Sequence, residues 1–483
     1  MTAAPTVLER SELYVGGEWV GTSSTTMVEV VCPSTEEVVA RVPDASIEDV
    51  DRAVAAARVA FDGGEWRLAT PADRAAVLRR MADELQARAD ELASLITLEC
   101  GAPIAFSRTA HVDGPIALLR HAAALAEEFR FEQSRQGAAN LGTVLYDPVG
   151  VTAAISAWNG PLYLMLNKVA PALAAGCSVV MKPAAPSPLD AFVVAEAAER
   201  AGLPPGVINL VTGGRDAGEA LVEHPGVDKV AFTGSTETGR RIMASCSRTM
   251  KRLTLELGGK SPAVVLDDVD LGSALPVLVT RMTMGTGQVC ILLSRLLVPR
   301  SRHDEIVEAV CGAIASLPVG DPFDERTVLG PVISEQQRAR IEGYVDSAVG
   351  DGATIALGGG RPAGLPRGWY VEPTVLTGVD NSARVAREEI FGPVIVTIPY
   401  DTEEEAIGIA NDSDYGLGSA VFTSERERGV AVARRLRTGI VGVNTYTIDP
   451  MLPFGGFKRS GFGREGGLDG LMEYLEPRAM IVR

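Results

Sequence analysis

Three side chains in this sequence could together form and break an acyl thioester. Cys290 ends the glycine-rich stretch Gly-Gln-Val-Cys, and Glu256 opens the stretch Glu-Leu-Gly-Gly-Lys upstream of it. Asn159 lies in Ala-Trp-Asn-Gly-Pro, where an apolar strand is predicted to turn into a helix. A thiol nucleophile, a carboxylate base and an amide that donates to an oxyanion are the groups that this chemistry requires.

The other cysteines and the histidines do not indicate a disulfide framework or a metal site. The chain has six cysteines without a C-x-x-C pair and only four histidines, so we predict free thiols and no bound metal. Most cysteines in proteins are small buried apolar residues. We assign that role to Cys32, Cys100, Cys177, Cys246 and Cys311.

Length and charge limit the classes of function. A chain of 483 residues is long enough for about three domains of ~150 residues each. Its formal charge of −17 argues against a nucleic acid or an anionic membrane as partner. Residues 1–10 lack an apolar signal segment, and the longest apolar stretch, Val169–Met181, is short of the ~20 residues that span a bilayer. We therefore expect a cytoplasmic protein.

The chain alternates predicted strands and helices. Ser46 and Thr70 each begin a helix pattern, and Ser187 begins another. Five predicted strands alternate with helix patterns, at Val151–Ala157, Ser178–Met181, Val207–Val211, Lys229–Phe232 and Arg252–Leu257. This order favours an α/β fold with a doubly wound parallel sheet. The alternation begins again at Ala263–Leu266, which predicts a second α/β domain.

A dinucleotide site can be predicted in parts. Thr233, Gly234 and Ser235 follow a strand and open a helix, where amide groups could meet a pyrophosphate, and Gly239 completes the spacing G-x-x-x-x-G. This spacing is not the common dinucleotide fingerprint, so an ordinary strand–turn–helix remains an alternative. Lys182 adds a cation at the carboxyl edge of the sheet, although it could also be a solvated strand end.

With these motifs the chain resembles the aldehyde dehydrogenase superfamily, from about Tyr14 to the C-terminus. The resemblance implies that Cys290 attacks an aldehyde and that Asn159 and the Cys290 N–H hold the oxyanion. Hydride would pass to the nicotinamide of NAD or NADP, and Glu256 would activate the water that hydrolyses the thioester. Lys168 and Glu465 match family positions, and relatives use the latter in proton relay, but the two could equally be structural ion-pair partners.

The same resemblance assigns cofactor contacts. Trp158 and Leu257 would pack near the cofactor, Lys182 would bond the adenosine ribose, and Glu389 and Phe391 would hold the nicotinamide half. NAD-preferring relatives often place a glutamate soon after the lysine, where this chain has Ala185. We therefore expect NAD to be favoured, with weaker exclusion of NADP than is usual.

The resemblance also outlines an aldehyde tunnel. Gly160 stands where relatives often have an aromatic residue, so the tunnel should be wide at its inner end. The remaining predicted lining is mostly apolar and consists of Tyr163, Leu164, Asn167, Ile291, Tyr446, Ile448 and Phe454. Such a lining suits an aromatic or medium-chain aldehyde better than a charged semialdehyde.

The implied architecture has three parts. Residues 1–128 and 148–257 would form the dinucleotide-binding domain, residues 258–460 the catalytic domain, and residues 129–147 and 461–483 a β arm for pairing of subunits. The arm would contain strands near Gly142–Tyr146 and Ala479–Val482, and a homodimer or homotetramer is expected. A CoA-acylating dehydrogenase and a non-catalytic binding protein remain as alternatives, although both would commonly lack one of the three central side chains.

Overall fold

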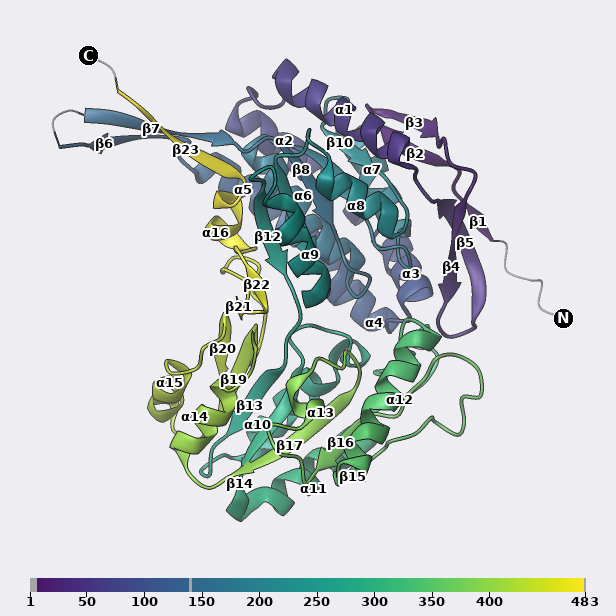
Figure 1. Cartoon of the computed structure of the whole chain (residues 1–483), viewed down its shortest axis with the longest axis vertical. Helices are drawn as coiled ribbons and strands as arrows, with labels where there is room; N and C mark the ends of the chain where they lie inside the picture. The colour runs from purple at the N-terminus through teal and green to yellow at the C-terminus, as the bar shows by residue number, and fades with distance from the viewer. Residues whose placement is uncertain (1–6, 139–140, 482–483) are drawn as a thin grey trace.

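The computed structural model describes residues 7–138 and 141–481. The predicted domains also include residues 1–6, 139–140 and 482–483, which lie outside the described residues. In Figure 1 the chain forms two α/β bodies, one above the other, with a ribbon of long strands projecting from the upper body. Within the described ranges, no helix is long and apolar enough to cross a membrane.

The upper body is built on an eight-stranded sheet of order β22-β12-β11-β8-β9-β10-β2-β3. Its five parallel strands are β8 (Val151–Ile155), β9 (Ser178–Lys182), β10 (Ile208–Leu210), β11 (Lys229–Thr233) and β12 (Arg252–Glu256). Antiparallel strands close both edges, namely β2 (Glu12–Val15), β3 (Glu18–Gly21) and β22 (Gly461–Phe462). The strand order reverses between β8 and β11, so the predicted doubly wound sheet is confirmed.

Side chains of this sheet point alternately to its two faces and pack into two separate cores. Val151, Ala153 and Ile155 of β8 pack on one face against α1 (Ile47–Gly63), α8 (Arg215–Glu223) and α9 (Thr236–Cys246). Ala154 faces the other side. That side is covered by α2 (Pro71–Ala87), α3 (Ala89–Cys100), α5 (Gly114–Glu128), α6 (Pro161–Ala175) and α7 (Leu189–Arg200). Between α3 and α5 the chain forms α4 (Ile104–Phe106) and a π-helix, η1 (Ser107–Asp113).

The first two predicted helix starts are confirmed. Ser46 accepts from the Asp49 N–H and Asp49 accepts from the Ser46 N–H, which satisfies two amides at the start of α1, and Thr70 with Asp73 repeats the arrangement at α2. α7 also begins where predicted, but the Ser187 hydroxyl donates to a carbonyl oxygen of Trp158 at 3.4 Å instead of capping the helix.

The lower body contains a seven-stranded sheet of order β15-β16-β17-β14-β13-β19-β20. Its strands are β13 (Ser261–Val265), β14 (Leu293–Pro299), β15 (Thr354–Leu357), β16 (Thr374–Thr377), β17 (Val394–Tyr400), β19 (Gly418–Phe422) and β20 (Ile440–Val443). Its helical segments are α10 (Leu271–Thr283), η2 (Met284–Gly287), η3 (Arg300–Arg302), α11 (His303–Ala315), α12 (Glu335–Gly350), α13 (Arg384–Arg387), α14 (Glu403–Asn411) and α15 (Arg426–Ala433). Residues 257–260 connect β12 directly to β13, so Glu256 stands at the junction of the two bodies.

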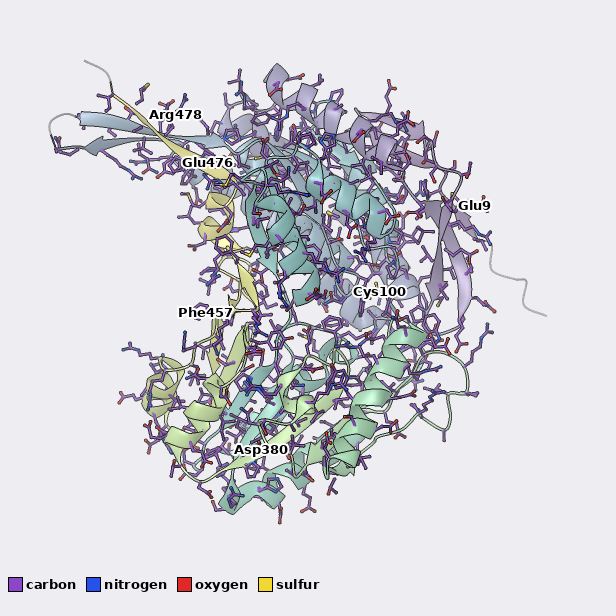
Figure 2. The ribbon with its side chains drawn as sticks, in the orientation of Figure 1. Glu9, Cys100, Asp380, Phe457, Glu476 and Arg478 are labelled. Carbon is purple, nitrogen blue, oxygen red and sulfur yellow. The ribbon has the colours of Figure 1, made fainter. Side chains whose placement is uncertain are left out.

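The projecting ribbon is a three-stranded sheet of β6 (Glu132–Gln136), β7 (Leu141–Pro148) and β23 (Leu475–Met480). The predicted arm segment 461–483 also contains β22, which belongs to the large sheet, and α16 (Gly467–Met472), which packs on α5 and α6. Val482, in the predicted terminal strand, lies outside the described residues. Glu476 of β23 pairs with Arg252 at the start of β12, and Arg478 pairs with Asp147 (Figure 2).

Two small sheets complete the fold. β1 (Leu8–Glu9), β5 (Glu37–Pro43) and β4 (Met27–Cys32) form one, and β18 (Tyr415–Gly416) with β21 (Phe457–Lys458) forms the other.

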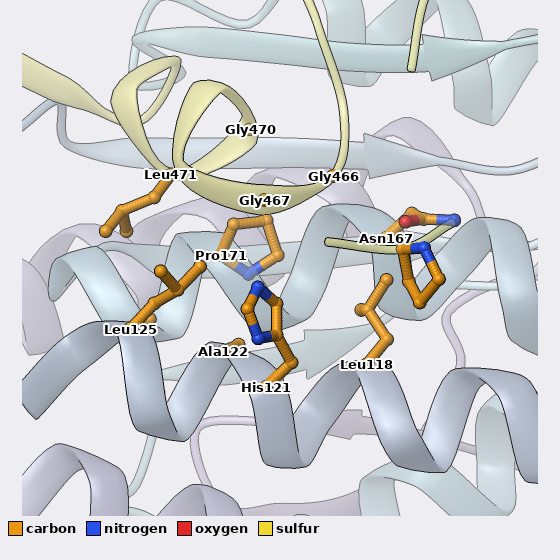
Figure 3. Close-up of a pocket in the computed structure, with 12 residues that line it drawn as sticks. Leu118, His121, Ala122, Leu125, Asn167, Pro171, Gly466, Gly467, Gly470 and Leu471 are labelled. Carbon is orange, nitrogen blue, oxygen red and sulfur yellow. The ribbon is translucent and has the colours of Figure 1, made fainter. Parts of the chain in front are cut away.

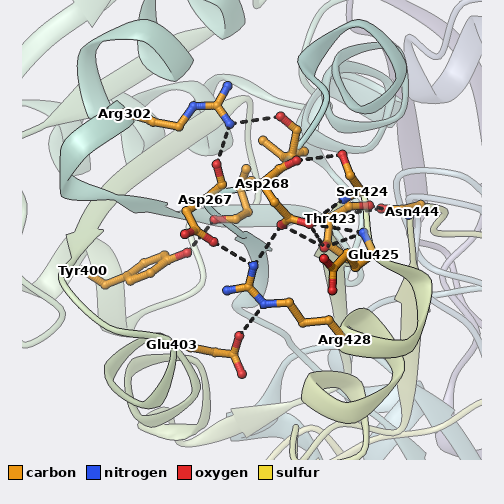
Figure 4. A network of polar contacts seen from close by, with 12 residues as sticks. Asp267, Asp268, Arg302, Tyr400, Glu403, Thr423, Ser424, Glu425, Arg428 and Asn444 are labelled. Carbon is orange, nitrogen blue, oxygen red and sulfur yellow. Dashed lines mark hydrogen bonds and ion pairs between the residues drawn. The ribbon is translucent and has the colours of Figure 1, made fainter.

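A polar network fixes the ends of β13, β19 and β20 (Figure 4). The Asp268 carboxylate accepts from the Thr423 hydroxyl at 2.7 Å and from Arg428 at 3.2 Å. Thr423 in turn exchanges two hydrogen bonds with the Asn444 side chain, at 2.9 and 2.8 Å. The network therefore anchors the start of the segment that carries Tyr446 and Phe454.

Candidate functional site

A cavity of about 720 Å³ lies between the two bodies. Cys290, Glu256 and Asn159 all line it, although Cys290 lies just before β14 of the lower sheet, Glu256 ends β12 of the upper sheet and Asn159 lies between β8 and α6. The structure thus brings together the three groups that the sequence analysis singled out.

A second cavity of about 700 Å³ extends from the first along the carboxyl ends of the upper strands. The two share Ala157, Trp158, Thr233, Gly234 and Ser235 as lining residues. These residues follow β8 and β11, the strands between which the sheet order reverses, and doubly wound sheets bind ligands at that point. Together the cavities form one continuous groove at this point of the sheet.

Cys290 follows a tight turn that needs glycine. Gly285, Thr286 and Gly287 all have positive φ, and a Cβ on Gly287 would stand 2.2 Å from the Gly392 carbonyl carbon. Burial raises the pKa of the Cys290 thiol, and the nearby carboxylates of Glu389 and Glu256 raise it further. Both effects favour the protonated thiol over the thiolate.

Glu256 is the last residue of β12 and is only 3 % exposed. Neither of its carboxylate oxygens has a hydrogen-bond partner within the described part of the chain. Burial and the Glu465 carboxylate raise the pKa of Glu256 well above its usual range, against opposing effects of Lys168 and Arg464. A buried carboxylate without protein partners is available to bind and deprotonate a water molecule.

Lys168 and Glu465 form a buried ion pair with 2.7 Å between Nζ and Oε1. The Lys168 ammonium also donates to the Thr233 hydroxyl at 2.6 Å. Glu465 is further fixed because its backbone N–H and C=O exchange hydrogen bonds of 2.7 Å with Phe454. The pair therefore links α6, β11 and the C-terminal segment beside Glu256.

Glu389 reaches the cavity because the two neighbouring glycines make room. The Gly259 N–H donates to its Oε1 at 3.0 Å, and a Cβ on Gly258 would stand 2.3 Å from its Oε2. A Cβ on Gly259 would likewise meet the Cys290 carbonyl oxygen at 2.3 Å. Burial raises the pKa of Glu389 to about 7. The Gly-Gly pair thus lets the cysteine segment and Glu389 approach the strand end.

The predicted cofactor contacts are grouped along the groove. Trp158 packs edge-to-face on Phe391, with ring centroids 5.3 Å apart. Lys182 lines the second cavity, and burial lowers its pKa to about 8. Ser235 caps α9 through the Thr238 N–H, and Leu257 lines the first cavity. Gly239 also packs closely, because a Cβ there would stand 2.5 Å from the Leu257 side chain.

The predicted tunnel residues divide into two groups. Leu164 lines the catalytic cavity, and Tyr163 and Asn167 lie on either side of it in the sequence of α6. Ile291 and Tyr446 are buried in the lower core, where Tyr446 lies against Gly418 in β19, with Ile448 and Phe454 packed beside them. Tyr446 therefore acts chiefly as a core side chain.

The expected widening at Gly160 is not what the structure shows. A Cβ built on Gly160 would stand 3.1 Å from Cε1 and 3.3 Å from Nδ1 of His111. The imidazole occupies the space that the missing side chain would have left. His111 carries no motif, and it could not be predicted as a neighbour of Gly160 from the sequence.

Two buried carboxyl groups lie behind the Trp158 loop. The Glu99 carboxylate accepts from the Leu189 N–H at 3.1 Å, and Cys100 donates to the Trp158 carbonyl oxygen at 3.1 Å. Both oxygens of Asp190 and one of Glu99 lack partners in the described ranges. Burial raises the pKa of Asp190 to about 7, and burial with the neighbouring Asp190 raises that of Glu99.

Several lining residues escaped the sequence analysis. Gln337 of α12 donates to the Phe391 carbonyl oxygen at 2.8 Å, and Arg340 donates to that of Glu389 at 2.7 Å. Arg215 and Arg241 line the second cavity together with Ala185. These residues lie on the polar faces of ordinary helices, and no local pattern distinguishes them.

A smaller cavity of about 20 Å³ lies between α5, α6 and α16 (Figure 3). His121, Pro171 and Gly467 meet there, with Asn167 at one side. Its volume suits a water molecule and is too small for an aldehyde.

The chain is similar to known aldehyde dehydrogenases along almost its whole length. The family model described as "Aldehyde dehydrogenase family" matches residues 19–480. Geranial dehydrogenase of Castellaniella defragrans is 46 % identical over 476 residues, which cover 98 % of this chain and 99 % of that protein.

Solved structures agree with this similarity. A Mycobacterium tuberculosis aldehyde dehydrogenase complexed with NAD+ superposes with a TM-score of 0.97 at 45 % identity, covering 99 % of both chains. A mutant of aldehyde dehydrogenase C from Pseudomonas syringae, complexed with NAD+ and octanal, has a TM-score of 0.95 at 44 % identity, covering 97 % of this chain and 96 % of that one.

Proposed function

Since the chain belongs to the aldehyde dehydrogenase family, we propose that Cys290, Glu256 and Asn159 oxidise an apolar aldehyde to its carboxylic acid. The observation that carries this proposal is that all three line one cavity, which continues into a groove along the switch point of the upper sheet. The protein is an aldehyde dehydrogenase that uses a nicotinamide cofactor. We further propose the role that each of these three residues has in the reaction.

The covalent step uses the thiol. The Cys290 sulfur attacks the aldehyde carbon, and the thiol proton passes to water in the cavity as the carbon–sulfur bond forms. The Asn159 amide and the Cys290 N–H hold the thiohemiacetal oxyanion, and losing one such donor typically costs ~10²–10³ in rate. A bound oxidised nicotinamide cofactor would supply the acceptor for the hydride. Loss of the hydride from the thiohemiacetal leaves a thioester on Cys290.

Hydrolysis of the thioester depends on Glu256. Its unpartnered carboxylate takes a proton from water, which attacks the thioester carbon and releases the acid and the thiol. Lys168 and Glu465 act on this carboxylate through their charges, because the ammonium lowers the pKa of Glu256 and the second carboxylate raises it. We therefore assign the ion pair a positioning role, which tunes the base without contacting the substrate.

The groove fits a dinucleotide. Backbone amides at Thr233–Ser235 and the start of α9 suit the phosphates, Lys182 suits the adenosine ribose, and Glu389 suits the nicotinamide ribose. We propose that NAD is preferred and that NADP is also accepted. Ala185 brings no carboxylate to the second cavity; Arg215 and Arg241 line that cavity together with Glu219 and Glu223, and Arg215 pairs with Glu219 at 2.7 Å.

The apolar substrate class is supported by the lining. Leu164 and Ile333 line the catalytic cavity, and Ile291 and Phe454 pack near Cys290. Each additional buried methylene of a substrate contributes about 0.8 kcal/mol. The names of the similar proteins are consistent with this class, since one is a geranial dehydrogenase and another was solved with octanal.

Assembly and location complete the proposal. The ribbon of β6, β7 and β23 projects from the upper body and carries exposed strand edges, which a second copy would cover in a homodimer or homotetramer. A cytoplasmic location is supported by six free thiols, one of which must stay reduced to react.

Product analysis tests the proposal against the CoA-acylating alternative. The protein is incubated with octanal and NAD, with and without CoA, and the products are separated by mass spectrometry. We expect octanoic acid in both cases and no dependence of the rate on CoA. Octanoyl-CoA as the main product would favour the acylating alternative, and reduction of neither cofactor by any aldehyde in a panel would refute the proposal.

A further inference from the structure

The side chain of His111 occupies the space into which a side chain at position 160, directly after Asn159, would project. A Cβ on Gly160 would lie 3.1 Å from Cε1 and 3.3 Å from Nδ1 of His111, and 3.8 Å from Cγ of Leu164. Leu164 itself lines the catalytic cavity. The imidazole is therefore packed against Gly160, which adjoins both the lining residue Leu164 and the oxyanion-binding amide of Asn159.

Glycine at position 160 leaves the space that the His111 ring occupies. Gly160 has φ −164°, an extended value that any residue adopts. An added side chain would meet the histidine ring before it met anything else. Glycine at 160 and histidine at 111 are thus sterically matched.

His111 is held firmly as a neutral ring. It is 6 % exposed, and burial lowers its pKa to about 4. Its ring packs edge-to-face on Phe106 with centroids 4.9 Å apart. Its position is set by the π-helix Ser107–Asp113, a rare local structure that is often found at functional sites.

We propose that His111 and Gly160 form a matched pair that sets the width of the aldehyde site next to Asn159. This inference rests on the proposed function and deepens it by naming the substrate shape. The ring limits the space around the first carbons after the carbonyl, while the rest of the lining accepts a long chain. The enzyme should therefore prefer aldehydes that are unbranched next to the carbonyl, such as octanal, over cyclic or α-branched aldehydes of similar size.

The experiment compares octanal with cyclohexanecarbaldehyde through the ratio of their kcat/KM values. In His111→Ala the ratio should shift by about tenfold or more towards the cyclic substrate, the size of effect that small steric changes produce in apolar pockets. His111→Phe should shift it the other way. His121→Ala is the matched control, because His121 borders the small cavity of Figure 3 and should leave the ratio unchanged.

A double-mutant cycle tests the pairing itself. Gly160→Phe alone forces the histidine ring aside, so NAD-dependent oxidation of octanal should fall at least about tenfold, and adding His111→Ala should restore a large part of it. Thermal unfolding and NAD binding of each variant identify any that fail to fold. If His111→Ala does not fold, the test uses His111→Phe, in which the kcat/KM ratio should shift towards octanal.

The outcomes separate this inference from the proposed function. A ratio within about twofold of wild type in both His111 variants, or no rescue in the double variant, would overturn the matched pair. Wild-type protein that oxidises neither aldehyde would refute the proposed function itself.

Discussion

Replacing Glu256 by glutamine should separate the two halves of the reaction. The amide keeps the shape of the side chain but cannot take a proton from water. The first half, attack by Cys290 and hydride transfer, does not need that proton transfer. We therefore expect Glu256→Gln to release one equivalent of reduced cofactor per site and then to stall as the thioester.

The magnitude follows from the surroundings of the carboxylate. Glu256 is 3 % exposed, and neither of its oxygens has a hydrogen-bond partner within the described residues. Both oxygens are therefore available to accept a proton from water. General base catalysis typically contributes ~10²–10⁴ in rate, and the steady-state rate should fall by that factor while the burst remains. Because burial and Glu465 raise the pKa of Glu256, hydrolysis in the wild type should be lost as the pH falls through a value above the ~4.3 of a free glutamate.

Stopped-flow absorbance at 340 nm measures the burst, and intact-protein mass spectrometry detects the acyl group. Glu465→Gln is the control, since it removes a neighbouring charge and keeps the base. A full steady-state rate in Glu256→Gln, or a stalled variant without an acyl adduct, would refute the assignment of the base.

Three further predictions concern other parts of the site. Ala185→Glu should weaken the use of NADP more than that of NAD, measured as kcat/KM for both cofactors; an equal effect on the two would show that another group sets the preference. Asn159→Ala should lower kcat about 10²–10³-fold while NAD binding, followed by fluorescence, is kept. Asp190 has a pKa raised to about 7 by burial, against ~3.9 in an unfolded chain, so its ionisation destabilises the fold as the pH rises between these values. Asp190→Asn should therefore raise Tm at pH 8 and not at pH 4, and a lower Tm at pH 8 would contradict the reasoning.

Local patterns in the sequence predicted much of the fold. The apolar runs at 178–181 and 229–232 are the central strands β9 and β11, and the cap signals at Ser46 and Thr70 begin helices as expected. These features depend on neighbours within a few residues. Cys290, Glu256 and Asn159 are far apart in the sequence, and only the fold brings them to one cavity. Their chemistry and the resemblance to a family allow them to be grouped before the structure is known.

Contacts between distant segments could not be predicted in the same way. His111 meets Gly160 through a π-helix that has no sequence signal, so an apparent gap in the tunnel wall was misread as space. Gln337 and Arg340 contact the loop of Glu389 from an unrelated helix. The motif that contains Gly239 does not reveal that Leu257 packs against it, with 2.5 Å between a Cβ at 239 and the leucine side chain.

The most direct test of the account is the substitution Cys290→Ala. Cys290 carries the covalent step and makes none of the proposed cofactor contacts, so aldehyde-dependent reduction of NAD should be abolished while NAD binds with nearly wild-type affinity. Both quantities are measured on the same preparation, by absorbance at 340 nm with octanal and by calorimetry with NAD alone. Appreciable turnover in the alanine variant would contradict the thiol mechanism.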